Sequence, residues 1–318
     1  MKTKSLTIKL TSALLFIALL FSFYHSSAST ETAITLKTTS GDIYGTLSLP
    51  EAGTSIPVAL IIAGSGPTDR DGNNTMMKNN SLKILATHLA ENGIAAVRFD
   101  KRGIAASKAA AAKEGALRFE DYINDVKGWI KVLRSDKRFS RIIVIGHSEG
   151  SLIGMIAATD ADAFVSIAGA GQSADLILKE QLSSQPEEVK SVAFPIIDKL
   201  KNGFTVMDVD PSFYSLFRPT VQPYMISWFK YDPQKEIAKL TIPVLITQGT
   251  SDIQVGVDDA KRLSKALPSA TLVLIEKMNH IFRITDGDRE ANMATYNQPE
   301  LPVAPELLSS VTSFILKK

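Results

Sequence analysis

Cysteine is absent from the 318-residue sequence. Its absence excludes disulfide bonds, thiolate metal sites and a cysteine nucleophile. Histidine is scarce as well, because only four occur, so few side chains can act as a base that is neutral near pH 7. Internal repeats and low-complexity tracts are also lacking. What remains is 45% hydrophobic and 21% charged residues, a composition typical of a globular protein.

An excess of charge of one sign is lacking too. The formal net charge is +2 at pH 7. Residues 1–28 hold three lysines and no acidic residue, so the rest of the chain has 32 basic and 33 acidic residues and a net charge of −1. No basic stripe with interleaved aromatic residues is present. We therefore expect no nucleic-acid partner.

The N-terminus carries an apolar run between a basic and a small-residue segment. The segment “MKTKSLTIKL” has three lysines, “SALLFIALLFSFY” is apolar, and “HSSAST” supplies small residues. This order is typical of a secretory signal peptide, and the apolar run is shorter than the ~20 residues that span a bilayer. We predict a signal peptide over residues 1–28, with cleavage near Ala28 or Ser29, and a secreted or periplasmic protein. We expect membrane association only if this segment is retained as an anchor.

Buried-strand and helical patterns alternate from residue 58 onward. Continuous apolar runs predict strands at 58–64, 94–100, 141–146, 163–171, 242–249 and 271–276. Helical spacing predicts helices at 81–93, 119–136, 148–158, 257–268 and 305–318. A hairpin is expected at 33–49. The alternation predicts an α/β fold with a mainly parallel central sheet and helices on both faces.

One long interval interrupts this alternation. Residues 172–239 separate two expected strands and are too many for a simple connection in a compact domain. The interval is also rich in aromatic residues. We predict a helical cap inserted at the sheet edge, part of which must form a small core of its own. Four of its side chains are candidates for an apolar substrate pocket: Phe213, Phe217, Tyr224 and Trp228.

A candidate nucleophile lies in “RIIVIGHSEGSLIGMIAA”, residues 141–158. Ser148 occupies the centre of a G-x-S-x-G pattern between an expected strand and an expected helix, which is the context of a nucleophile elbow. In such a tight turn Gly146 and Gly150 would avoid collisions that a side chain would cause. The helix that follows would direct its positive N-terminal end toward the serine.

A serine hydroxyl needs a base to remove its proton. His25 lies in the predicted signal peptide and His88 lies within an amphipathic helix. His147 belongs to the elbow itself, and we expect its side chain to point away from the serine. His280 follows the last expected strand in a loop and is therefore the candidate base.

The base in turn needs a carboxylate that orients it. Asp252 follows the expected strand at 242–249, where such a group belongs. Asp258 and Asp259 fall in the first turn of the next expected helix, where acidic residues complement the helix dipole. Glu276 and Asp286 are weaker candidates.

A tetrahedral intermediate needs hydrogen-bond donors for its oxyanion. One candidate is the backbone N–H of Glu149, and the other comes from “AGSGPTDRDGNN”, residues 63–74, through Ser65 or Gly66, with Ser65 preferred. The same stretch resembles a calcium loop, but Asn74 and Asn80 occupy the positions of its glycine and glutamate. We expect no metal and interpret the charged residues 69–71 as groups that brace the loop rather than bind substrate.

Taken together, these motifs resemble those of bacterial esterase D-type serine carboxylesterases, in the α/β-hydrolase superfamily. The resemblance is carried by “GSGPTDRDGN”, “FDKRG”, “GHSEG”, “RPTVQPYMISWFKYDP”, “QGTSDIQV” and “NH”. It implies an α/β-hydrolase domain over residues 29–318 with an eight-stranded sheet. It also implies Ser148 as nucleophile, Asp252 as acid and His280 as base. The chain departs from many hydrolases in “DKRGIAASK”, where Ala105 replaces a glycine and leaves the shape of that loop open.

The leading hypothesis is a serine carboxylesterase that hydrolyses short-chain acyl esters through an acyl-enzyme. We expect a small-molecule ester as substrate and no cofactor, and the oligomeric state stays open. One alternative is a peptidase or amidase with the same triad, in which Glu149 would bind a substrate amine. Another is a non-catalytic ligand binder with this fold, although a binder has no need of a full triad and oxyanion loop.

Overall fold

The computed structural model describes residues 29–51, 53–111 and 113–317. The predicted signal peptide, residues 1–28, lies outside the described residues.

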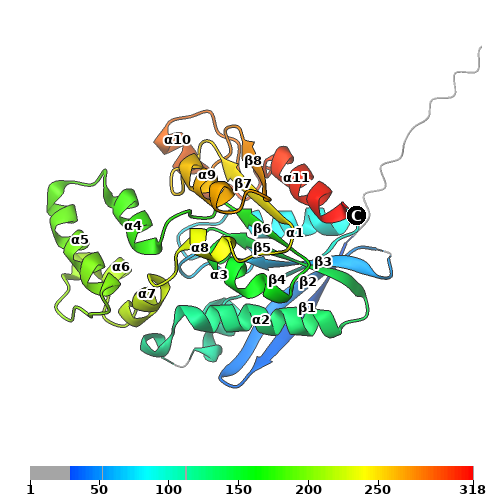
Figure 1. The fold of residues 1–318 in the computed structure, drawn as a ribbon, viewed down its shortest axis with the longest axis horizontal. Coiled ribbons are helices and arrows are strands. Elements are labelled where there is room, and N and C mark those ends of the chain that lie inside the picture. Colours follow the sequence, from blue (N-terminus) through cyan, green and yellow to red (C-terminus); the bar gives the residue numbers. More distant parts are fainter. Residues whose placement is uncertain (1–28, 52, 112, 318) are drawn as a thin grey trace, which may run out of the picture.

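Eight strands form one sheet in the order β1-β2-β4-β3-β5-β6-β7-β8 (Figure 1). The strands are β1 (Thr30–Thr38), β2 (Gly41–Leu49), β3 (Ile56–Ile62), β4 (Ala95–Phe99), β5 (Phe139–His147), β6 (Ala163–Ile167), β7 (Val244–Gly249) and β8 (Thr271–Ile275). β1 and β2 form the expected hairpin, and β2 pairs antiparallel with β4. The other neighbouring strands are parallel, so the predicted mainly parallel sheet is confirmed.

Helices cover both faces of the sheet, as predicted. The helices outside the cap are α1 (Ser81–Glu91), α2 (Phe119–Ser135), α3 (Glu149–Ala157), α9 (Val257–Ala266), α10 (Arg289–Ala294) and α11 (Pro305–Leu316). Short 3₁₀ turns lie at η1 (Ala105–Ala110), η2 (Glu114–Ala116), η3 (Ala158–Asp160) and η5 (Thr295–Asn297). Buried side chains of α1 and α11 pack in one core, and those of α2, α3 and α9 pack in another. The sequence patterns did not predict α10.

The central strands contribute to both cores because successive side chains of a strand point to opposite faces. In β3, Val58, Leu60 and Ile62 enter the core under α2 and α3, whereas Ala59 and Ile61 enter the core under α1 and α11. Both faces of β3 are therefore buried, which explains why its sequence is apolar at every position rather than at every second one.

Between β6 and β7 the chain forms further helices, most of which lie as a group beside the sheet (Figure 1). They are α4 (Ala174–Leu182), α5 (Glu187–Lys201), η4 (Pro211–Phe213), α6 (Tyr214–Phe217), α7 (Gln222–Trp228) and α8 (Pro233–Ile237). The last of them, α8, packs back against α3 and α9. We call these residues, 174–237, the cap. The cap has a hydrophobic core of its own that includes Ile197, Leu200, Phe217 and Phe229.

The parallel strands β3 to β8 all end at one edge of the sheet, and the candidate groups follow these ends. Ser148 follows β5, Asp252 follows β7 and His280 follows β8. In α/β sheets the carboxyl ends of the strands are where ligands bind. The fold therefore gathers side chains that are far apart in the sequence at one edge.

Candidate active site

Ser148 occupies a strained turn between β5 and α3. Its backbone has φ 55° and ψ −120°, in a region that residues other than glycine rarely adopt. A Cβ atom at Gly146 would lie 2.2 Å from the carbonyl oxygen of Gly150, and one at Gly150 would lie 2.5 Å from that of Ile62. Both glycines are therefore required for the backbone to pass this turn.

Asp252 and His280 form an oriented pair. His280 Nδ1 lies 2.8 Å from Asp252 Oδ2, and because the carboxylate accepts, Nδ1 donates the hydrogen and Nε2 is left for a different partner. The other oxygen of Asp252 accepts the backbone N–H groups of Gln254, at 2.8 Å, and Val255, at 3.0 Å. Burial raises the pKa of Asp252, but His280 and these hydrogen bonds outweigh burial and hold it below its usual value. The carboxylate therefore stays ionised near neutral pH.

The structure brings Ser148 and His280 to the same small cavity, of about 60 Å³. Ser65 of the loop after β3 and Gln254 of the loop after β7 also line it. Among the described residues the Ser148 hydroxyl has no hydrogen-bond partner, so it is available to a ligand. The arrangement places a free hydroxyl and a histidine that a carboxylate orients at one cavity, and these are the side chains that nucleophilic catalysis by serine uses.

His147 packs against the candidate base. The centroids of its ring and of the His280 ring lie 4.8 Å apart. His147 Nε2 donates a hydrogen bond to the His280 carbonyl oxygen at 2.9 Å. Burial, followed by the nearby His280, lowers the pKa of His147 to about 3. His147 is therefore a neutral ring that supports the candidate base, a role that sequence reasoning missed.

The two candidate oxyanion donors have free N–H groups. Within the described part of the chain, the backbone N–H of Ser65 donates no hydrogen bond. The same holds for the N–H of Glu149, the first residue of α3. Ser65, Gly66 and Glu149 line, together with Ser148, a larger cavity of about 310 Å³. The predicted donors thus share one cavity with the candidate nucleophile.

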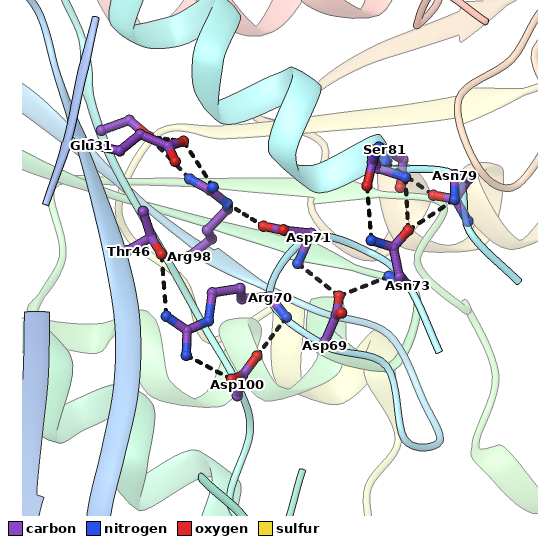
Figure 2. Close-up of polar contacts among 12 residues, drawn as sticks. Glu31, Thr46, Asp69, Arg70, Asp71, Asn73, Asn79, Ser81, Arg98 and Asp100 are labelled. Carbon is purple, nitrogen blue, oxygen red and sulfur yellow. Dashed lines mark hydrogen bonds and ion pairs between the residues drawn. The ribbon is translucent and has the colours of Figure 1, made fainter. Parts of the chain in front are cut away.

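The loop that carries Ser65 and Gly66 is braced by charged residues, as expected (Figure 2). Arg70 donates to Asp100 through its guanidinium, at 2.6 Å, and through its backbone N–H, at 2.8 Å. Arg98 links Asp71, at 2.7 Å, to Glu31 of β1, at 2.8 Å. Asp69 accepts two backbone N–H groups of the loop itself. These contacts confirm the bracing interpretation of residues 69–71.

The side chain of Glu149 is buried and fully engaged. Its Oε2 accepts from Lys101 Nζ at 2.7 Å and its Oε1 accepts from the Tyr224 hydroxyl at 2.5 Å. Both oxygens therefore have partners within the protein, and neither is free to bind a substrate amine. Sequence reasoning missed Lys101, although it follows β4 at the same sheet edge as the other candidate residues.

The loop after β4 keeps a left-handed backbone at the position where many hydrolases have glycine. Ala105 has φ 42° there, a conformation that costs a residue with a side chain roughly 1–2 kcal/mol. The loop is held by Asp100, which accepts the Ala106 N–H at 3.1 Å. Ala105 therefore adopts the backbone conformation that glycine has in many hydrolases, at the cost of local strain.

Only two of the four predicted cap residues line the larger cavity. Tyr224 and Trp228 contribute to its wall, with Met225 between them on α7. Phe213 and Phe217 do not, because Phe217 is buried in the cap core and Phe213 packs against that core. The assignment of Phe213 and Phe217 to the substrate pocket is therefore wrong: Phe213 at the end of η4 and Phe217 at the end of α6 pack with the cap core.

Within the described residues, no group of three or more histidine, aspartate or glutamate side chains could hold a metal ion. The same part of the chain contains no helix long and apolar enough to cross a membrane.

Comparisons with known proteins find similarities in sequence and in fold. A family model described as serine aminopeptidase S33 matches residues 78–226. Esterase EstD of Thermotoga maritima is 27% identical over 257 residues, which cover 76% of this chain and 58% of EstD. The chain thus spans little more than half the length of this curated relative.

Solved structures with low sequence identity share the fold. Est1E from Butyrivibrio proteoclasticus superposes with a TM-score of 0.59 at 17% identity, over 90% of this chain and 99% of Est1E. An esterase of Pyrococcus furiosus gives a TM-score of 0.56 at 16% identity, over 90% of this chain and 91% of that one. At such identities the similarity is one of fold.

Proposed function

Because the chain belongs to the α/β-hydrolase fold, we propose that it is a serine carboxylesterase that hydrolyses short-chain acyl esters of small molecules. The observation that carries the proposal is the cavity shared by Ser148 and His280, with Asp252 bound to the other nitrogen of the His280 ring. The likeness to an enzyme named as an esterase supports ester chemistry over other uses of the fold.

The proposed reaction has two halves. His280 Nε2 takes the proton of Ser148 as the serine oxygen attacks the ester carbonyl, and the backbone N–H groups of Ser65 and Glu149 stabilise the oxyanion. The C–O bond to the alcohol then breaks, and His280 returns the proton to the alcohol as it leaves. In the second half His280 removes a proton from water as the water oxygen attacks the acyl carbonyl. The bond between the acyl carbon and Ser148 Oγ then breaks, His280 returns the proton to Oγ, and the carboxylic acid leaves. Asp252 stays ionised and stabilises the imidazolium.

Glu149 favours an ester without an amino group over an aminopeptidase substrate. An aminopeptidase has to bind the ammonium group of its substrate, which calls for a free carboxylate. Among the described residues that line the 310 Å³ cavity, Glu149 is the one acidic side chain, and Lys101 and Tyr224 occupy both of its oxygens. We therefore infer that p-nitrophenyl butyrate is a far better substrate than aminoacyl anilides.

The cavity supports a small acyl group. Its wall is largely apolar, with Leu152, Met225 and Trp228 among its residues, and also carries Gln172 and Gln181. Apolar walls favour each buried methylene by about 0.8 kcal/mol, until the chain outgrows the space under the cap. We infer a preference for acyl chains of roughly two to eight carbons.

The first prediction tests the nucleophile. Ser148→Ala should lower kcat on p-nitrophenyl butyrate by several orders of magnitude, because the covalent intermediate can no longer form. A fluorophosphonate probe should label the wild-type protein at Ser148, as mapped by peptide mass spectrometry. Circular dichroism should show that the variant is folded. Labelling at a different serine, or near-full activity of the variant, would refute the assignment.

We also propose that the protein acts outside the cytoplasm, in the periplasm or the medium, after removal of residues 1–28. The proposal rests on the basic, apolar and small-residue order of the N-terminal sequence.

A further inference from the structure

Lys101 contacts both segments of the chain that supply the candidate oxyanion donors. It follows β4, and its side chain is 1% exposed. Its Nζ donates to the carbonyl oxygen of Gly64 at 2.6 Å and to Glu149 Oε2 at 2.7 Å. The ammonium group also lies 4.9 Å from the ring centroid of Tyr122. A lysine is rarely buried so completely unless it is paired, and both of its polar partners belong to the oxyanion machinery.

The first contact orients the donor from the loop after β3. A trans peptide unit is planar, so the Gly64 carbonyl and the Ser65 N–H point in opposite directions from one rigid group. The Lys101 ammonium, 2.6 Å from the Gly64 carbonyl oxygen, therefore also sets the direction of the Ser65 N–H. Its charge also polarises the peptide and makes the Ser65 N–H a stronger donor.

The second contact orients the donor from the elbow. The candidate N–H belongs to Glu149 itself, and the side chain of the same residue is held by Lys101 at 2.7 Å and by Tyr224 at 2.5 Å. The carboxylate balances the ammonium charge, which makes the burial of both groups tolerable. One side chain thus joins the two loops that supply the two donors.

We propose that Lys101 is a positioning residue that holds both oxyanion donors, the Ser65 N–H and the Glu149 N–H, in the geometry that the tetrahedral intermediate requires. The inference rests on the proposed esterase function, because it assigns Lys101 to the same reaction. Lys101 itself does not touch the reacting atoms.

A thiono ester separates this role from a general effect on folding. Sulfur is a weaker and larger hydrogen-bond acceptor than oxygen, so an oxyanion hole shaped for oxygen favours p-nitrophenyl butyrate over its thiono analogue. Lys101→Met should lower kcat on the oxo ester roughly tenfold to a hundredfold with little change in KM. The rate on the thiono ester should fall much less, so the oxo-to-thiono ratio of kcat/KM should decrease.

Two further variants serve as controls. Lys101→Met combined with Glu149→Gln leaves no unpaired buried charge, and the oxo-to-thiono ratio should stay low because the Gly64 carbonyl still lacks its donor. Arg102→Met breaks the neighbouring ion pair with Asp125 and should leave the ratio at its wild-type value.

The outcomes separate this inference from the proposed function. If the wild-type protein hydrolyses neither ester, the proposed function fails. If the wild-type protein is active and the Lys101 variants retain its oxo-to-thiono ratio, the positioning role is overturned, whatever their overall activity. A decrease of the ratio in both Lys101 variants and not in Arg102→Met supports it.

Discussion

At the scale of single residues, burial decides the charge of His147. The ring is enclosed between His280 and Phe282, with both centroids 4.8 Å away, and its pKa falls to about 3. An exposed histidine in the unfolded chain takes up a proton near pH 6.5. The unfolded state therefore binds one more proton than the folded state between these pH values, and acid favours unfolding through this residue.

This linkage gives a prediction for stability. Between pH 7 and pH 5 the free energy of unfolding of the wild-type protein should fall by about 2 kcal/mol more than that of His147→Gln. Glutamine keeps a donor for the His280 carbonyl but takes up no proton. Urea denaturation at the two pH values measures the difference. Parallel pH dependence in both proteins would show that His147 is protonated in the folded state.

A second residue-scale prediction concerns the elbow. Gly146→Ala should destabilise the protein by about 4 kcal/mol or more, because its Cβ would lie 2.2 Å from a backbone oxygen. Gly115→Ala is the matched control, since its Cβ would meet no atom closer than 3.9 Å, and its effect should stay within about 0.5 kcal/mol. Urea unfolding of the two variants compares them. A mild effect at Gly146 would mean that the turn can relax.

At the scale of elements, individual side chains of α6 and α7 differ in whether they face the cap core or the cavity. Phe217 of α6 lies in the cap core, whereas Tyr224 and Trp228 of α7 line the cavity wall, and Leu216 of α6 lines it too. The Trp228 ring also stacks on Phe119 of α2, with the centroids 6.0 Å apart and the planes 13° apart. Because Tyr224 bonds to Glu149, α7 connects the cap to the elbow.

This division predicts which cap residue sets the acyl preference. Trp228→Ala should enlarge the cavity, so kcat/KM for an ester two carbons longer should rise roughly tenfold relative to butyrate. Phe217→Leu should destabilise the cap and leave the chain-length optimum unchanged. A series of p-nitrophenyl esters from acetate to laurate measures both. An unaltered profile in Trp228→Ala would exclude this side chain from acyl selection.

At the scale of the whole molecule, two ion pairs connect the first strand, β1, to the loop beside the candidate active site. Glu31 of β1 bonds to Arg98 of β4, and Arg98 bonds to Asp71 in the loop that follows Ser65 and Gly66 (Figure 2). Cleavage near Ala28 or Ser29 would leave Glu31 in place. Maturation at the proposed position is therefore compatible with the bracing of this loop.

This gives the last prediction. Protein isolated from its native compartment should begin near Ser29 or Thr30 by N-terminal sequencing, and a chain that starts at Ser29 should be as active as the native form. A chain that starts at Gly41, without β1, should lose stability and activity. Recovery of an intact Met1 on membrane-bound protein would instead identify the segment as an anchor.

The sequence alone predicts the strands, most of the helices outside the cap and the Asp252–His280 pair, because each follows from a local apolar period or from the end of a strand. It does not separate Phe217 from Trp228, since helices as short as α6 and α7 show no clear apolar face. Nor does it predict the contacts of Glu149, whose partners Lys101 and Tyr224 lie 48 and 75 residues away along the chain. Such contacts depend on tertiary packing.

The cap is inserted between β6 and β7, after the strand that leads to Ser148 and before the strands that lead to Asp252 and His280. The ends of β5, β7 and β8 are fixed by the sheet, so the length and sequence of the insertion can change while the three side chains keep their positions. The shape of the cavity and the placement of these three side chains can therefore evolve separately, as long as the cap keeps the contact of Tyr224 with Glu149. Exchange of the cap for one of different shape that preserves this contact is a route to new substrate selectivity with the same proposed triad.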